Sequence, residues 1–401
     1  MLPGAWSGVR AEVPVVTDAR LAGDEKETRL VLDLSRKVDI RAFTLADPYR
    51  VVVDLSQVNF QLPERIGERG RGLVKAFRFG LVMQGGSRIV IDVARPVRVE
   101  KAFVLDASSS QPARLVLELG ATDRDSFMRN LAVENRAARQ SSLARKPQDA
   151  AGQPTTRPDN DPRPVVVIDP GHGGIDTGTR APDGLEEKVI VLDFAMLLRD
   201  KIEKTGKYRV VLTRSDDTFI PLNERVRLAR SHQAQLFISI HCDALAKGEG
   251  EAQGATVYTM SDKASDSEAA KLADQENKAD VIAGVDLSSE AEDIADILID
   301  LAQRETKTFS VHFARTLVGQ LKVSARLHKH PLKSAGFIVL RAPDVPSVLV
   351  ELGYVSNEQD LKQLTSDAWR SKVGDTIVHA INMFFATRLA GGNAGAAAGK
   401  N

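Results

Sequence analysis

The chain has 401 residues, enough for two or three domains, and its 54 Lys and Arg residues balance 54 Asp and Glu residues. This balance excludes the bulk electrostatic attraction typical of nucleic-acid-binding proteins, and no stretch approaches the roughly 18 consecutive apolar residues of a membrane span. The single cysteine, Cys242, excludes an internal disulfide framework and a zinc site built from a cysteine cluster.

Four similar segments in the first third of the chain alternate apolar and polar residues, as half-buried β-strands do. Each begins with Arg and has an acidic residue at its fifth position; they are 29–34, 50–55, 88–93 and 114–119. Further strands are expected at 38–45, 73–79 and 97–104, with turn residues between them. This run of short strands without a convincing helix predicts a small β-sandwich or barrel over about residues 10–120.

Residues 121–164 have a different composition, rich in Arg, Ala, Ser, Gln, Asp and Pro. A segment so poor in apolar residues buries too little surface to offset its chain entropy, so we expect a flexible linker. The exception is the stretch Phe127–Leu131, whose apolar residues suit a short docked piece.

From Val165 the pattern changes to alternating strands and helices. Helices are expected at 187–204, 223–232 and about 369–388, and strands at 165–169, 209–213, 236–241, 256–260, 337–340 and 348–351. This alternation is typical of an α/β domain, here over 165–388, in which helices flank a mostly parallel, twisted sheet. The Gly- and Ala-rich tail, residues 389–401, is expected to be disordered.

Three of these strands lead into side chains that commonly bind metals. His172 lies in a glycine-rich stretch directly after the first strand, and His241 and Glu351 are the last residues of two later strands. Because sites in open α/β sheets form at the carboxyl ends of the strands, we expect these side chains to lie together. Glu187, in the first turn of the next helix, adds a second carboxylate. Two imidazoles and a carboxylate with an open fourth position form a hydrolytic zinc set.

Each of these residues alone has an ordinary structural explanation. A histidine at a strand end is more often capped or solvated, and Glu187 fits the preference of helix N-termini for acidic residues. The convergence of three strand ends and a helix start favours a site over these explanations. The glycines around His172 also indicate that the backbone lies close to something bound.

The motifs that carry these residues are Asp169-Pro-Gly-His-Gly-Gly174, Glu187-Lys188, Leu212-Thr-Arg214, Ser239-Ile-His241 and Val350-Glu-Leu-Gly-Tyr-Val-Ser-Asn357. Together they resemble the zinc-dependent N-acetylmuramoyl-L-alanine amidases of the cell-division type, over essentially all of 165–388. The β-rich region before them is similar to the AMIN-like localisation domain of such amidases, which binds peptidoglycan or targets the division site.

The resemblance implies that His172, Glu187 and His241 bind Zn²⁺ and that Glu351 is the catalytic carboxylate. Glu186 is the alternative to Glu187, although the family pattern has the ligand directly before the lysine. The implied reaction is hydrolysis of the amide between N-acetylmuramic acid and the L-alanine of the stem peptide. Zinc would activate water and polarise the carbonyl, and Glu351 would transfer the proton to the leaving amine.

Three polar residues near the motifs are given structural roles. The side chain of Cys242 points to the opposite face from that of His241, so we expect it to pack in the core. Arg214 and Arg225 are candidates for binding substrate carboxylates, but salt bridges within the fold are the favoured explanation.

An acidic helical stretch interrupts the catalytic region: residues 262–305 hold 13 Asp and Glu against 4 Lys and Arg. Within it, Ser289–Glu292 resembles a capping box that begins a helix with one apolar stripe, continuing to Gln303. A solvated surface helix is one explanation. The resemblance implies another, because activator-dependent division amidases carry an insert here, about 262–322, whose helix covers the zinc site.

We therefore expect autoinhibition, in which an acidic residue occupies the open position of the zinc. Glu290 is the candidate, with Glu292 and Asp293 as alternatives. A LytM-type activator protein that binds the insert helix would draw it away from the site.

Two other functions compete with a peptidoglycan amidase: a zinc peptidase acting on soluble peptides, and a non-catalytic peptidoglycan-binding module. A complete ligand set with Glu351 disfavours the module, because a binding module has no use for a general base. A peptidoglycan substrate implies the periplasm of a Gram-negative cell. The first residues, Met1–Trp6, lack the basic and apolar regions of an export signal, so we expect that signal to be absent from this sequence.

Overall fold

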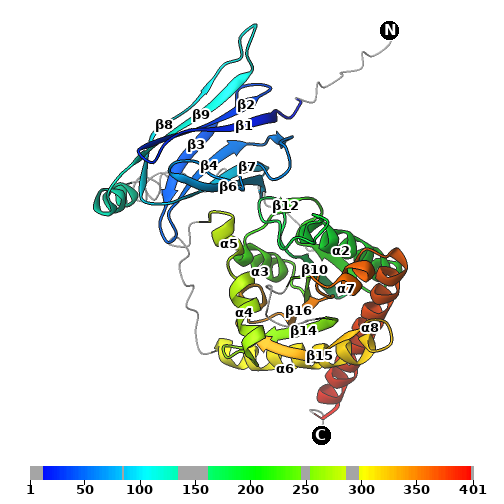
Figure 1. Ribbon diagram of the computed structural model, residues 1–401. Coiled ribbons are helices and arrows are strands. Elements are labelled where there is room, and N and C mark those ends of the chain that lie inside the picture. Colours follow the sequence, from blue (N-terminus) through cyan, green and yellow to red (C-terminus); the bar gives the residue numbers. More distant parts are fainter. Residues whose placement is uncertain (1–11, 84, 134–160, 245–252, 286–297, 399–401) are drawn as a thin grey trace, which may run out of the picture. The chain divides into compact units, whose positions relative to one another are not determined.

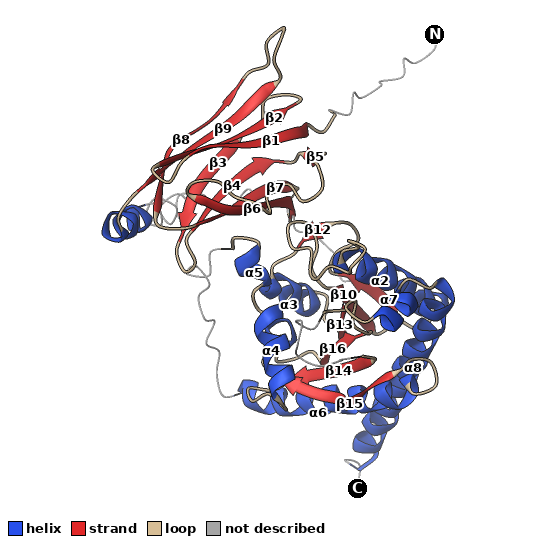
Figure 2. Cartoon of the chain, in the orientation of Figure 1, coloured by secondary structure: helices blue, strands red, loops and turns tan. Residues whose placement is uncertain are grey.

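The computed structural model describes residues 12–83, 85–133, 161–244, 253–285 and 298–398. The chain forms two compact units, Met1–Thr156 and Arg157–Asn401. The first is built mainly of strands and the second of strands and helices (Figures 1 and 2). Within the described residues, no helix has both the length and the apolar composition that crossing a bilayer requires.

The first unit is a sandwich of two mainly antiparallel sheets, as predicted. One sheet has the strand order β5-β1-β2-β9-β8, and the other contains the neighbours β6-β7-β4-β3. The strands are β1 (Val15–Gly23), β2 (Glu27–Leu34), β3 (Ile40–Leu45), β4 (Arg50–Ser56), β5 (Asn59–Phe60), β6 (Val74–Val82), β7 (Gly86–Val93), β8 (Val97–Leu105) and β9 (Ala113–Ala121).

The four repeated segments form the central strand pairs of the two sheets, β2 with β9 and β4 with β7. The apolar residues at the second, fourth and sixth positions of each segment face the space between the sheets and are buried there. On the outer faces, the first residue of one segment lies opposite the fifth residue of its antiparallel partner: Arg29 pairs with Glu118, and Arg88 pairs with Asp54 through two hydrogen bonds. Exposed ion pairs contribute little stability each, so their main effect is on strand register.

The sequence analysis missed β1 and β5. The pairing of β1 with β2 shifts between Val16 and Asp18, which breaks the alternation that identifies a strand, and β5 is too short to show one. After β9 the chain is helical over 124–133. Phe127 of this helix is buried, and its ring lies edge-on to that of Tyr49 at a centroid distance of 5.1 Å. The docked piece expected around Phe127 is therefore present.

The second unit contains a six-stranded sheet with the order β11-β10-β13-β16-β14-β15. All neighbours are parallel except β14 and β16, which confirms the mostly parallel sheet. The strands are β10 (Val165–Pro170), β11 (Arg209–Leu212), β12 (Thr218–Phe219), β13 (Leu236–His241), β14 (Ala255–Met260), β15 (Leu327–Ala335) and β16 (Ser347–Glu351). The helices are α2 (Glu187–Lys204), α3 (Leu222–Ser231), α4 (Ser267–Glu276), α5 (Ala279–Ile282), α6 (Leu298–Leu321), α7 (Glu358–Leu364), α8 (Asp367–Ala398) and the 3₁₀ helix η2 (Ile338–Leu340).

Every residue of β10, β13 and β16 is buried. Apolar residues of α2, α6 and α8 pack with alternate residues of these strands in one continuous core. Coverage by helices explains why the strands read as continuous apolar runs in the sequence. The strands β10, β13 and β16 are adjacent and parallel, so their carboxyl ends lie side by side.

Two boundary predictions for this unit were wrong. The segment 337–340 is not a strand: its residues 338–340 form η2, and the strand precedes it as β15. A short apolar run does not distinguish a strand from a buried helical turn, and the edge strand β15 is hidden in the sequence by its Lys, His and Pro residues. The last helix does not end near 388 but continues to Ala398, through residues expected to be disordered. Alanine is the strongest helix former, and it dominates this stretch.

Phe194 and Val189 lie on the same helix, α2, but only Phe194 is buried in the core, whereas Val189 is 43% exposed. We expect Phe194→Ala to lower the free energy of unfolding by roughly 3–5 kcal/mol, because it leaves a cavity. Val189→Ala should change it by less than about 0.5 kcal/mol. Urea unfolding and calorimetry of the full chain measure both, and equal effects would contradict this core assignment.

Candidate active site

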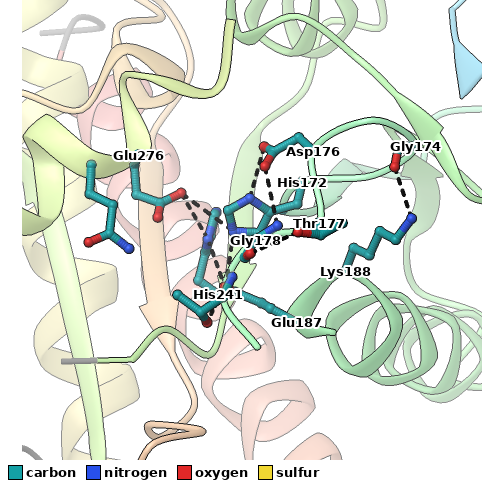
Figure 3. A network of polar contacts seen from close by, with 12 residues as sticks. His172, Gly174, Asp176, Thr177, Gly178, Glu187, Lys188, His241 and Glu276 are labelled. Atoms are coloured by element: carbon teal, nitrogen blue, oxygen red, sulfur yellow. Dashed lines mark hydrogen bonds and ion pairs between the residues drawn. The ribbon is translucent and has the colours of Figure 1, made fainter. Parts of the chain in front are cut away.

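The structure brings together three of the residues singled out by the sequence. His172, Glu187 and His241 offer ligand atoms that all lie within 4.8 Å of one another (Figure 3). Oε1 of Glu187 is 3.2 Å from Nε2 of His172 and 3.4 Å from Nδ1 of His241. Both nitrogens are buried, and neither has a well-formed hydrogen bond within the described residues. Unsatisfied buried nitrogens that face one carboxylate oxygen fit a metal ion in their midst.

The loop after β10 holds His172 in an unusual backbone conformation, with φ at +58°. Nδ1 of His172 is 2.9 Å from Oδ2 of Asp176, which turns Nε2 toward Glu187. Such a hydrogen bond fixes the orientation and tautomer of a metal-binding imidazole. A Cβ atom on Gly171 would lie only 2.4 Å from the ring of His241, so this position requires glycine. The glycine next to His172 thus lets the backbone approach the ring of the second histidine, His241.

Two buried arginines hold this loop through hydrogen bonds to its backbone. Arg225 donates to Asp169 at 2.8 Å and to the carbonyl oxygen of His172 at 2.7 Å. Arg214 donates to the carbonyl oxygen of Gly171 at 2.7 Å. Asp169 also accepts hydrogen bonds from two hydroxyls, those of Thr213 and Ser239. Arg225 thus forms a buried salt bridge, as favoured from the sequence, and Arg214 supports the loop through hydrogen bonds to backbone carbonyls.

Glu187 is held rigidly at the start of α2. Its Oε2 accepts hydrogen bonds from the backbone and hydroxyl of Thr179, and its Oε1 accepts one from the backbone N–H of Cys242. Burial opposes its charge, but His172 and His241 outweigh that effect and hold the pKa of Glu187 well below its ordinary value. Glu186 instead pairs with Arg180, away from the histidines. The side chain of Cys242 is buried in the apolar core.

Glu351 lies at the end of β16, in register with His241 on β13. Its Oε2 accepts a hydrogen bond from the backbone N–H of Asp243 at 3.1 Å, whereas its buried Oε1 has no hydrogen-bond partner among the described residues. Burial, together with the negative charges of Asp243, Glu187 and Glu276, raises the pKa of Glu351 well above its ordinary value. Such an environment suits a carboxylate that exchanges protons near neutral pH.

A fourth group, missed from the sequence, completes the cluster. Glu276, the last residue of α4, places its Oε2 3.1 Å from Nδ1 of His241 and 3.7 Å from Nε2 of His172 (Figure 3). The neighbouring Gln275 donates its side-chain amide to both carboxylate oxygens of Asp243, at 2.8 and 3.0 Å.

The sequence analysis did not single out Asp243, Gln275 or Glu276, and only Asp243 has a recognisable pattern in the sequence. Asp243 lies two residues after His241 at a strand end, a spacing that places two side chains on one side. Glu276 is one of many acids in an acidic stretch, and only the tertiary structure distinguishes it. Glu290, with its alternatives Glu292 and Asp293, lies outside the described residues.

The site therefore gathers buried acidic groups that repel one another. Burial and the charges of Glu187 and Glu276 raise the pKa of Asp243 well above its ordinary value. Burial likewise raises the pKa of Glu276, although His241 and His172 oppose the effect. A divalent cation between the imidazoles and Glu187 would relieve this repulsion.

Comparison with known proteins gives a consistent result. Residues 166–383 match the Amidase_3 family, described as N-acetylmuramoyl-L-alanine amidase, and residues 18–119 match the AMIN domain. The chain is 33% identical to N-acetylmuramoyl-L-alanine amidase AmiC of Neisseria meningitidis serogroup B, over 94% of this chain and 91% of that protein. It is 32% identical to AmiC of Escherichia coli O6:H1 over the same shares.

A shorter relative matches the catalytic region. N-acetylmuramoyl-L-alanine amidase AmiA of Escherichia coli K12 is 38% identical over 55% of this chain and 76% of that protein. The sequence motifs, the converging side chains and these matches agree. The chain belongs to the Amidase_3 family of N-acetylmuramoyl-L-alanine amidases and carries an AMIN domain before its catalytic domain.

Proposed function

We propose that this amidase is a zinc-dependent peptidoglycan hydrolase of the periplasm, held inactive by α4 until a partner protein releases it. Its reaction is cleavage of the amide between N-acetylmuramic acid and the L-alanine of the stem peptide. The observation that carries the proposal is the meeting of His172, Glu187 and His241 within 4.8 Å, next to the buried carboxylate of Glu351. The AMIN domain would bind peptidoglycan or direct the enzyme to the division site.

Zinc is the metal that suits this donor set best. Two imidazole nitrogens and one carboxylate oxygen leave a fourth position for the reaction. Zinc bound here supplies an activated water and polarises the scissile carbonyl. The hydrogen bonds from His172 to Asp176 and from Thr179 to Glu187 hold the metal-binding side chains in place before any metal binds.

Glu351 then serves as the proton carrier. The backbone N–H of Asp243 occupies its Oε2, so Oε1 is the oxygen left to accept a proton from the attacking water. Water adds to the carbonyl carbon, the C–N bond breaks, and Glu351 returns the proton to the leaving nitrogen. The products are a lactyl carboxylate on the sugar and a free amino group on L-alanine.

The resting state is closed by α4. The carboxylate of Glu276 lies where an exchangeable ligand would approach the two histidines, so it competes with water and substrate. The helix is anchored on both sides of this contact: Asp266 caps its first turn through Ala269, and Asn277 exchanges two hydrogen bonds with the chain at Gly336 and Ile338. A LytM-type activator that binds the insert would have to break these contacts.

The identity of the cleaved bond tests the function directly. Peptidoglycan digested with the full chain should release peptides that begin with a free L-alanine, measured by mass spectrometry. A chelator should abolish release and added zinc should restore it, because Glu351 alone neither lowers the pKa of the water nor polarises the amide carbonyl. A different new N-terminus would indicate a peptidase, and no release even after α4 is disabled would indicate a binding module.

Glu351→Gln should retain stoichiometric zinc and lose nearly all hydrolysis, by roughly 10²–10⁴-fold, because the amide does not accept a proton. Dye release from labelled sacculi measures the rate, and elemental analysis measures the metal. Wild-type turnover in this variant would exclude Glu351 as the general base.

Glu276→Ala should raise the rate of hydrolysis without activator by roughly 10- to 100-fold. This is the increase expected if the open state makes up roughly 1–10% of the unaltered protein and all of the variant. Asp274→Ala is the matched control, since Asp274 lies on the same helix but is 71% exposed in its ion pair with Lys278. Glu290→Ala tests the acid first suggested by the sequence. Autoinhibition by Glu276 would be contradicted if Glu276→Ala had no more effect than Asp274→Ala.

A further inference from the structure

Asp243 is a buried carboxylate beside the catalytic residue, yet none of the reaction steps above uses its side chain. It is 2% exposed, and its backbone N–H holds Glu351. Both of its carboxylate oxygens accept hydrogen bonds from the amide of Gln275, and one also accepts the backbone N–H of Ala244. Among the described residues, Gln275 is thus the residue whose side chain donates hydrogen bonds to Asp243. It belongs to α4, the helix that has to move away from the site under the proposed activation.

The two contacts of α4 with the site come from consecutive residues of different chemistry. Glu276 presents carboxylate oxygen to the two histidines, and Gln275 presents an amide N–H to Asp243. An amide substrate offers the same two groups side by side, a carbonyl oxygen and an N–H. Asp243 is also close to His241 in the chain: His241 is the last residue of β13, and Asp243 lies two residues later, a spacing that places both side chains on the same side.

We propose that Asp243 is a substrate-binding residue, which accepts the N–H of the scissile amide and then the ammonium group of the released L-alanine. The inference rests on the proposed function and names the group that recognises the peptide side of the bond. In the resting enzyme, Gln275 occupies this acceptor. When α4 leaves, Asp243 loses its amide donor, and the substrate replaces it.

The chemistry of the product fits this role. Delivery of one proton by Glu351 turns the amide nitrogen into a neutral amine and leaves a carboxylic acid on the sugar side. At neutral pH that acid gives up its own proton and the amine takes one up, so the products are a carboxylate and an ammonium group. A buried carboxylate binds an ammonium more strongly than an amide, because the hydrogen bond then joins two opposite charges. Asp243 therefore distinguishes a stem peptide that begins with an amino group from one that lacks it.

The test uses the full, zinc-loaded chain with Glu276→Ala, which opens the site. The probes are the tripeptide L-Ala-γ-D-Glu-meso-diaminopimelate and its propionyl analogue, which lacks the alanine amino group. Calorimetry should show that Asp243→Asn weakens binding of the tripeptide at least about tenfold, with little change for the propionyl analogue. Asp243→Ser should give the same result, which guards against a folding defect in either variant.

Kinetics on a soluble muramyl tripeptide should show the loss mainly as a higher KM, with retained zinc. The proposal is overturned if both Asp243 variants bind the two probes as their parent does, or if they lose their zinc and so reveal a metal-site residue. Failure of the proposed function would appear separately, as a parent enzyme that releases no L-alanine peptides from peptidoglycan.

Discussion

Burial of like charges is the constraint on which this catalytic domain depends. Glu187, Asp243, Glu276 and Glu351 are all almost fully removed from solvent within one cluster. Buried carboxylates are stable only when protonated, hydrogen-bonded or paired with positive charge. A divalent ion held between the two imidazoles would supply that positive charge. The fold therefore keeps a strongly electronegative site ready for a cation.

The scaffold can hold this cluster because its parts come from rigid elements. Three adjacent parallel strands end at one edge, so His172, His241 and Glu351 are brought together by the sheet itself. Asp169 and the two arginines replace the regular hydrogen bonds that the loop around His172 lacks. The part of the cluster that comes from α4 is different, because a helix on the rim can leave without unfolding the sheet.

The resting state that we propose has a simple physical basis. From one helix end, Glu276 lies against the two imidazole nitrogens and Gln275 donates its amide to Asp243. In the proposed closed form, Gln275 provides the buried carboxylate of Asp243 with a side-chain hydrogen-bond donor, which stabilises that form. Under this proposal, release requires either a partner that binds α4 or a substrate that offers the same contacts.

Much of this architecture was accessible from the sequence. The alternation of strands and helices predicted which residues end the strands of the catalytic domain. The recurring Arg segments predicted four strands of the sandwich, and the structure shows that these are its central pairs. Strand β1 was lost because a register shift breaks its alternation, and β15 because an edge strand tolerates Lys, His and Pro. Glu276 was lost for a deeper reason: its position depends on how a helix packs across the sheet edge, which no local pattern encodes.

X-ray absorption at the zinc edge tests the central claim most directly. The full chain should bind one zinc with a shell of nitrogen and oxygen at roughly 2.0–2.2 Å, including two imidazoles and no sulfur. In Glu276→Ala the imidazole signals should persist while the oxygen part of the shell changes. A folded protein that binds no metal, or a zinc–sulfur distance near roughly 2.3 Å from Cys242, would contradict the account.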